Sequence, residues 1–291
     1  MAIQVEITRI SNDKQAIKQA IEAKGDITIP NDTLIDAYST YVDDILVGGT
    51  VDMEKYLGYN MTRLVLTPDI AMPVTTSKYD ECFYNQLNLK ELVIQSDAII
   101  PNNAFGIYGA TSSAPFGAPI KKITISSSTY CERDYVNSET VTNPSLSYAL
   151  VWGSPSTTNN HLPICSKIVI DCQPTRLGNH LLSDFVNVKS IDIPSTVTEF
   201  GTYCFSGCGF ETFTIPSQIT GIGGNCFRKC LSLTTVYCEP TTPPTISNAT
   251  QNIFFGSDAL AHIYVPLESV EAYKQAQYWS DYASIIEAMP S

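Results

Sequence analysis

Apolar residues recur along this chain in one short pattern: an apolar residue, two variable residues, a second apolar residue, one variable residue and a third apolar residue. The pattern predicts a β-strand with one buried edge, because alternate side chains of a strand point to the same face. It begins at Met61, Leu89, Ile120, Cys165, Val188, Phe210, Leu233 and Leu260. From Cys165 to Leu233 the copies start 22 or 23 residues apart. Such a period predicts a solenoid, whose coils stack to complete a shared core and offer an extended surface rather than a pocket.

Residues 188–208 and 210–230 match in residue type at almost every position. Each copy has a strand, a proline that ends it, a second extended segment, a glycine turn, and a Cys-Phe pair that we expect to fill the core. Together with a Cys-x-x-Leu element and the closing Ile-Tyr-Val-Pro run at 263–266, these features resemble the BspA-type leucine-rich repeat family. The resemblance covers about residues 61–286, and it implies a fold and a binding habit without naming a partner.

The fold expected is mainly β with some α, organised in two parts. A leucine-rich-repeat solenoid spans residues 51–291 and includes a C-terminal cap with a short helix at 267–291. Residues 1–50 do not repeat, and helix-capping signals followed by apolar stripes predict a small helical unit there. The second stripe consists of Leu34, Tyr38, Tyr41, Val42 and Ile45. This unit is either a cap for the first coil or an anchor that attaches the chain to something else.

Charge and composition narrow the function. The chain carries a formal net charge of −12, which disfavours nucleic acid and anionic membranes as partners. No apolar run is long enough to span a bilayer, so membrane insertion is not expected. The first ten residues include charges where a secretory signal has an apolar run. We therefore expect either release by lysis or assembly, or a leader that is missing from this sequence.

The nine cysteines allow three interpretations. The pairs Cys204/Cys208 and Cys226/Cys230 have the composition of a four-thiolate zinc site, and disulfides between coils are a second possibility. We favour a third, in which the thiols are small core side chains at repeated positions. His161, His180 and His262 are isolated in sequence, and no nucleophile, metal-protease or phosphate-loop motif is present. The expectation is therefore a protein that is not an enzyme and has no cofactor and no metal site.

The N-terminal segment has a second resemblance. The run Ile10-Ser-Asn, Ala16-Ile, Ala20-Ile21, Lys24-Gly25, Ile29-Pro, Leu34, Tyr38 and Ile45 is similar to the start of many bacteriophage tail and virion-decorating proteins. It implies a virion structural or decoration protein, assembled in the host cytoplasm, that contacts other virion proteins through Leu34, Tyr38, Tyr41, Val42 and Ile45 and recognises a host-surface protein or glycan with its solenoid. The alternatives are a bacterial cell-surface adhesin without its leader and an intracellular interaction scaffold. A homo-oligomer is possible in each case.

Two surfaces are candidate binding sites. Strand alternation places one column of side chains outward next to the buried positions: Val65, Val93, Thr124, Val169, Asp192, Thr214, Tyr237 and Tyr264. A neighbouring outward column contributes Lys122, Lys167 and His262. The second surface is the long interval 126–162, with Tyr130, Tyr135, Tyr148 and Trp152. This interval is either a degenerate coil around residues 146–151 or a protruding loop.

Overall fold

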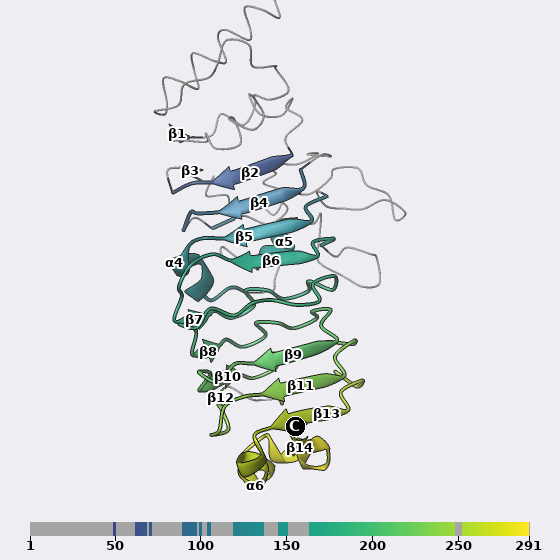
Figure 1. The fold of residues 1–291 in the computed structure, drawn as a ribbon. Coiled ribbons are helices and arrows are strands. Elements are labelled where there is room, and N and C mark those ends of the chain that lie inside the picture. The colour runs from purple at the N-terminus through teal and green to yellow at the C-terminus, as the bar shows by residue number, and fades with distance from the viewer. Residues whose placement is uncertain are drawn as a thin grey trace, which may run out of the picture.

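The repeats form a stack of parallel strands in a computed structural model, which is elongated along the stacking direction (Figure 1). The structure describes residues 49–50, 62–68, 70–71, 89–97, 99–100, 104–105, 119–136, 145–150, 163–247 and 252–290. The helices predicted within residues 1–48, with Leu34, Tyr38, Tyr41, Val42 and Ile45, lie outside these ranges, as does Trp152.

Seven of the eight predicted segments contain strands. The first four are β2 (Arg63–Leu66), β4 (Glu91–Ile94), β5 (Lys122–Ile125) and β6 (Lys167–Ile170), which pair in parallel in this order. The next three are β9 (Thr212–Ile215), β11 (Thr235–Cys238) and β13 (His262–Val265), and β14 (Ile286–Ala288) closes their sheet. Leu64, Leu92, Ile123 and Ile168 lie directly opposite one another and are buried. The register predicted from the spacing is therefore confirmed in these sheets.

The prediction of a strand after Val188 is wrong. Residues 188–193 form no strand, and the sheet of β6 is not continued to β9. This coil is instead held by a second ladder, in which β8 (Glu199–Phe200) pairs in parallel with β7 (Arg176–Leu177) and with β10 (Gly221–Gly223). Its core residues Val188 and Phe185 remain buried, so the stack continues without a strand at this point.

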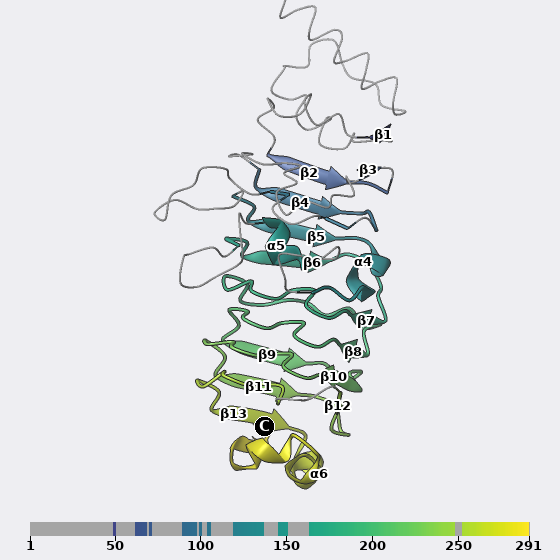
Figure 2. The ribbon, with the colours of Figure 1, turned by 180° about the vertical axis from the view of Figure 1, so that it is seen from behind.

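The second ladder follows the ends of the main strands along one side of the molecule (Figure 2). It consists of β7, β8, β10 and β12 (Thr245–Ser247), and each strand belongs to the short extended segment predicted after the proline. Two further short strands, β1 (Gly49–Thr50) and β3 (Ile70–Ala71), pair in parallel near the start of the described chain.

Phenylalanines fill the core between the two ladders. Phe205, Phe227 and Phe254 form a stacked column, with ring centroids 5.4 Å and 5.5 Å apart. Each is nearly or completely buried. The predicted equivalence of the Cys-Phe pairs in successive coils is thus confirmed for Phe205 and Phe227.

The cysteines at the repeated positions are buried, as the core-thiol interpretation predicted. Cys204, Cys208, Cys226 and Cys230 are at most 3% exposed and carry free thiols. Cys208 Sγ donates to Leu182 O at 3.0 Å. Burial raises the pKa of Cys230 to about 12, so this thiol stays protonated at neutral pH. Within the described ranges, no three His, Cys, Asp or Glu side chains come together as a metal site.

The interval 126–162 contains two short helices. These are α4 (Ser128–Glu132), capped by the Ser127 side chain, and α5 (Leu146–Leu150). All five residues of α5 are buried, and Phe105 N donates to Ala149 O at 2.8 Å. Figure 2 shows α5 on the inner side of the first sheet. Residues 145–150 are therefore part of the core and not of a protruding loop.

The tyrosines of this interval are not binding residues on an exposed surface, and that prediction is corrected. Tyr130, Tyr135 and Tyr148 are 1%, 2% and 7% exposed. Tyr135 Oη donates to the backbone oxygen of Tyr130 at 2.8 Å, which satisfies the hydroxyl inside the core. A buried tyrosine with a partner for its polar tip is a packing residue.

The chain ends in short helical turns, η2 (Leu267–Ser269), α6 (Val270–Gln275) and η3 (Ser280–Ile285), followed by β14. Tyr273 Oη donates to Pro240 O at 2.8 Å, and Trp279 Nε1 donates to Pro244 O at 2.9 Å. Both side chains are fully buried, so this segment covers the last coil. In the part of the chain that is described, no helix has the length and apolar character needed to cross a membrane.

Candidate functional site

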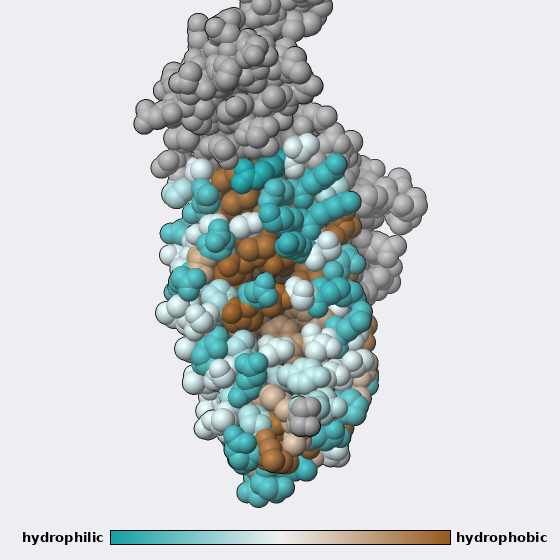
Figure 3. Space-filling model, viewed as in Figure 1, coloured by the Kyte–Doolittle hydropathy of each residue, from teal (hydrophilic) through white to brown (hydrophobic). Residues whose placement is uncertain are grey.

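The outward face of the two main sheets presents side chains in aligned columns. Arg63, Glu91, Lys122 and Lys167 occupy one register position across β2, β4, β5 and β6. In the other sheet Thr212, Thr235 and His262 form the equivalent row. On this face, hydrophilic residues gather over the starts of β2, β4 and β5, and hydrophobic residues lie toward the strand ends (Figure 3). Over β2, β4 and β5 the face therefore changes from hydrophilic at the strand starts to hydrophobic at the strand ends.

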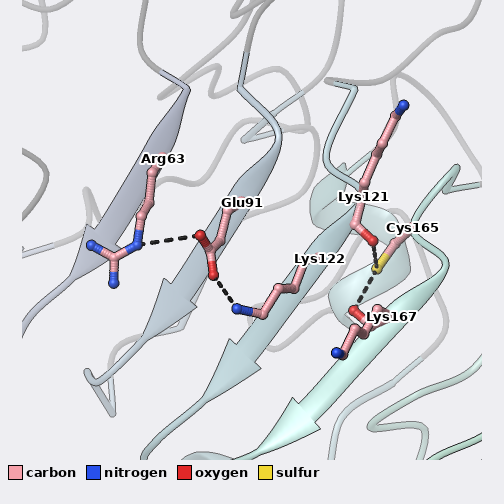
Figure 4. A network of polar contacts seen from close by, with 6 residues as sticks. All are labelled: Arg63, Glu91, Lys121, Lys122, Cys165 and Lys167. Atoms are coloured by element: carbon pink, nitrogen blue, oxygen red, sulfur yellow. Dashed lines mark hydrogen bonds and ion pairs between the residues drawn. The ribbon is translucent and has the colours of Figure 1, made fainter. Parts of the chain in front are cut away.

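The half formed by β2 to β6 is basic. Glu91 lies between two cations, with Arg63 Nε 3.4 Å from Oε2 and Lys122 Nζ 2.5 Å from Oε1 (Figure 4). Further basic side chains at the strand starts are exposed: Lys90, Lys121 and Lys167. Five basic side chains thus gather at these strand starts, and two of them pair with Glu91, in a chain whose net charge is −12. Partly exposed ion pairs of this kind add under about 1 kcal/mol to stability, so the contribution of these pairs to folding is small.

A buried cysteine lies beneath this cluster, next to the backbone at the starts of β5 and β6. Cys165 is buried, and its Sγ lies 3.3 Å from Lys167 O and 3.5 Å from Lys121 O (Figure 4). Burial raises the pKa of this thiol to about 11, so it donates rather than ionises at neutral pH. The backbones that carry Lys121 and Lys167 are joined directly, since Lys167 N donates to Lys121 O at 3.1 Å, and the buried thiol lies beneath this contact.

The valines of the outward column are less available than predicted. Val65 and Val93 are each only 5% exposed, so the expectation that they contact a partner is wrong. A short side chain within a sheet is flanked by longer neighbours on the same face, and these remove it from solvent. Thr124 and Val169, at the same position in β5 and β6, are partly exposed and remain candidates.

The half formed by β9 to β14 is polar and aromatic. Tyr237 and Tyr264 pair across β11 and β13, and their rings stack with centroids 5.2 Å apart and planes at 27°. His262 stacks on Tyr264 at 5.5 Å, with its Nδ1 3.6 Å from Glu287 Oε2. Thr214 lies next to Tyr237 and is exposed. The structure therefore brings together Thr214, Tyr237, Tyr264 and His262, as the sequence predicted.

The stacking of these rings determines which of their surfaces are open to a binding partner. Tyr264 stacks on both Tyr237 and His262, so the flat surface of its ring is partly covered from within the patch. The ring edges and the phenol hydroxyl groups are the other parts of a tyrosine that can contact a partner.

Residues 188–193 separate the basic half from the aromatic half. Asp192 and Ser190 are exposed there but belong to no strand, so they do not extend the aligned columns. Lys189 Nζ lies 3.4 Å from Glu211 Oε1 and links this coil to the start of β9. The face is thus two adjoining patches, and Asp192 lies between them.

A further column of side chains lies on the turns after the strands of the second ladder. Apart from the spacing of its residues, nothing in the sequence predicted it. His180 and Tyr203 stack with ring centroids 4.7 Å apart, and the Arg228 guanidinium carbon lies 5.8 Å from the Tyr203 centroid and 5.7 Å from that of Phe255. His180, Tyr203 and Asn225 all have positive φ, at 54°, 58° and 59°. These residues are 23 and 22 residues apart, so each occupies the same position in the turn of its coil. We therefore assign this column a structural role in the turns.

His180 should make stability depend on pH. Burial lowers its pKa to about 4, from an ordinary value of 6.5. The folded state therefore disfavours protonation of His180. The stability that comes from keeping this side chain neutral is fully present above about pH 6.5 and is lost as the pH falls toward 4. We expect His180→Asn, which suits a positive φ, to flatten the stability profile between these values. Denaturant unfolding of both proteins at pH 7 and pH 4.5 measures it, and parallel profiles would contradict the assignment.

Comparisons with known proteins identify the repeat. Residues 160–282 match the family described as BspA type leucine rich repeat region, in 6 copies. The chain is therefore similar to that family over about two fifths of its length. A leucine-rich repeat protein from Bacteroides ovatus ATCC 8483 is similar in structure, at 22% identity and a TM-score of 0.33, covering 51% of this chain. The match spans 32% of that protein. A search of curated proteins found no match.

Proposed function

We propose, from the BspA-type leucine-rich repeat region at residues 160–282, that this chain is a non-enzymatic binding protein that docks another protein on the outward face of its solenoid. The observation that carries the proposal is the aligned, partly exposed patch of Tyr237, Tyr264 and His262 on β11 and β13. These side chains point away from the core, and tyrosine is enriched at the centres of protein interfaces.

The basic half extends this docking face. Arg63, Lys122 and Lys167 lie in register, and Lys90 and Lys121 are exposed beside them. A partner that places acidic groups over β2 to β6 and apolar or polar groups over β11 and β13 complements both patches. Exposed charges of this kind act mainly on the association rate and on specificity. We therefore expect the association rate to fall as the salt concentration rises.

We also propose where the protein acts, which is on a bacteriophage virion. A bacteriophage virion and a bacterial cell surface both suit a binding protein with a BspA-type region, and the virion proposal rests on the resemblance within residues 1–50. Immunogold electron microscopy of purified particles and of intact cells, with an antibody against the chain, separates the two. Label on particles supports the virion, and label on cell envelopes alone replaces it with the adhesin.

The docking face can be tested without a known partner. Labelled protein is applied to a panel of intact bacteria that includes the native host, after protease or periodate treatment of the cells. We expect the combination of Tyr237→Ser and Tyr264→Ser to weaken binding by about tenfold or more, since interface tyrosines commonly contribute above 1 kcal/mol. The matched control is Tyr203→Ser, which removes a tyrosine that stacks on His180 at the turn after β8.

The two treatments separate the partner classes. Protease should abolish binding, and periodate should leave it intact. Binding that resists protease and is lost on periodate treatment would replace the protein partner with a glycan. Equal binding by the double variant and the parent, with unchanged melting, would remove the aromatic patch from the site.

A further inference from the structure

Two thiols from different coils meet at one corner of the stack. Cys131 lies in the last turn of α4, and Cys172 follows β6 by two residues. They are 41 residues apart in sequence, yet their Sγ atoms are 3.8 Å apart. An S–S bond is about 2 Å long, so the two sulfurs must move closer together before they can bond.

This pair differs from the other described cysteines. Of the eight described cysteines, Cys172 alone is partly exposed, and the other seven are buried, with Cys131 at 0%. Like Cys208 and Cys230, Cys172 also donates to a backbone oxygen of the neighbouring coil, Ile125 O at 3.4 Å, but it is in addition close to a second thiol. The pair at 131 and 172 therefore combines a partly exposed cysteine with a buried one.

The surroundings assign a role to each thiol. Either thiol of the 3.8 Å contact can donate, and a bond from Cys131 to Cys172 Sγ lowers the pKa of Cys172, because it stabilises the Cys172 thiolate. The same interaction and burial raise the pKa of Cys131 well above its ordinary value. Cys172 is thus the first to ionise, and a thiolate is the attacking form in disulfide exchange.

We propose that Cys131 and Cys172 are a redox-active dithiol that low-molecular-weight disulfides such as oxidised glutathione convert into an intramolecular disulfide. The Cys172 thiolate attacks one sulfur of oxidised glutathione, forms a mixed disulfide and releases one glutathione thiolate. Cys131 then attacks Cys172 Sγ, and its proton passes to the departing glutathione thiolate, which leaves as the second glutathione. Two protein thiols are oxidised, and one glutathione disulfide is reduced by two electrons to two glutathione molecules.

The segments that carry the two cysteines are held together by several contacts. Gly178 N donates to Cys131 O at 2.7 Å, and Arg176 contacts both Glu132 O, at 2.9 Å, and Asp134 Oδ1, at 3.0 Å. A Cβ at Gly178 would lie 1.9 Å from Arg133 O, so the two segments pack backbone to backbone. The disulfide would fasten α4 to the entry of β7, where the first sheet gives way to the second ladder. It would close a long loop and stabilise the chain in oxidising surroundings.

Trypsin separates these two cysteines cleanly. Cleavage after Lys122, Arg133, Lys167 and Arg176 places Cys131 in peptide 123–133 and Cys172 in peptide 168–176, each with one cysteine. The full chain is incubated natively with oxidised glutathione, alkylated, digested and analysed by mass spectrometry. We expect a cross-linked pair of these peptides that reductant separates, and a higher melting temperature of the oxidised chain.

Two conservative variants test the order of events. Cys131→Ser should accumulate glutathione on Cys172, because the resolving thiol is gone, and its melting temperature should not rise. Cys172→Ser should take up no glutathione at Cys131. Melting of each reduced variant reports whether it is folded. Glutathione on Cys131 in the folded parent, a cross-link to another cysteine, or unchanged alkylation of both peptides after oxidation would each overturn the proposal.

Discussion

Replacing Phe227 with alanine is expected to lower the free energy of unfolding by about 3 to 5 kcal/mol. Phe227 is completely buried and lies between Phe205 and Phe254, whose ring centroids are 5.4 Å and 5.5 Å away. Phe213 approaches the same ring to 4.7 Å. The truncation leaves a cavity that touches three coils, and a stack with contacts only between neighbouring coils has few ways to close it.

Denaturant unfolding followed by circular dichroism measures this loss. The matched control is Phe255→Ala, since Phe255 belongs to the same coil region but is 42% exposed. We expect the control to cost clearly less than Phe227→Ala, because a large part of the Phe255 ring is already in contact with water and its removal leaves no enclosed cavity. Similar losses for both variants would mean that the Phe column is not the main contact between these coils.

The strand register was predictable because it depends on a local pattern. Alternation within each strand determines which side chains face inward, and the coil period determines which strands are neighbours. The alternation is present at Leu64, Leu92 and Ile123, which pair as predicted although their spacings of 28 and 31 residues exceed the regular period. The missing strand after Val188 was not predictable in this way. Its residues match those of β9, including the proline that follows, and only the neighbouring backbones determine whether the ladder forms.

The candidate site was predictable in position but not in exposure. Tyr237 and Tyr264 are paired as the repeat spacing required, yet their mutual stacking depends on side-chain conformations that no pattern specifies. Val65 and Val93 point outward by alternation, but they are buried by their surroundings. Cys131 and Cys172 lie 41 residues apart, on a coil whose length departs from the repeat, so no spacing brought them together.

Glycine marks the places where coils touch through their backbones, and β10 contains two that differ sharply. A Cβ at Gly223 would lie 2.2 Å from Thr202 N, a distance that real side chains do not reach. That amide already donates to Asn179 Oδ1 at 2.7 Å, so it has little freedom to move. At Gly221 the nearest atom to an added Cβ is Glu199 Cγ, at 3.3 Å, and this belongs to an exposed, flexible side chain.

We therefore expect Gly223→Ala to destabilise the chain by about 3 kcal/mol or more, because overpacking against backbone forces the coils apart. Gly221→Ala should stay within about 1 kcal/mol of the parent, since alanine also restricts the unfolded chain. Parallel denaturant titrations of the two variants measure the difference. Two equal and small effects would show that the turn after β8 can move away from β10, and the close stacking of these coils would then not depend on glycine.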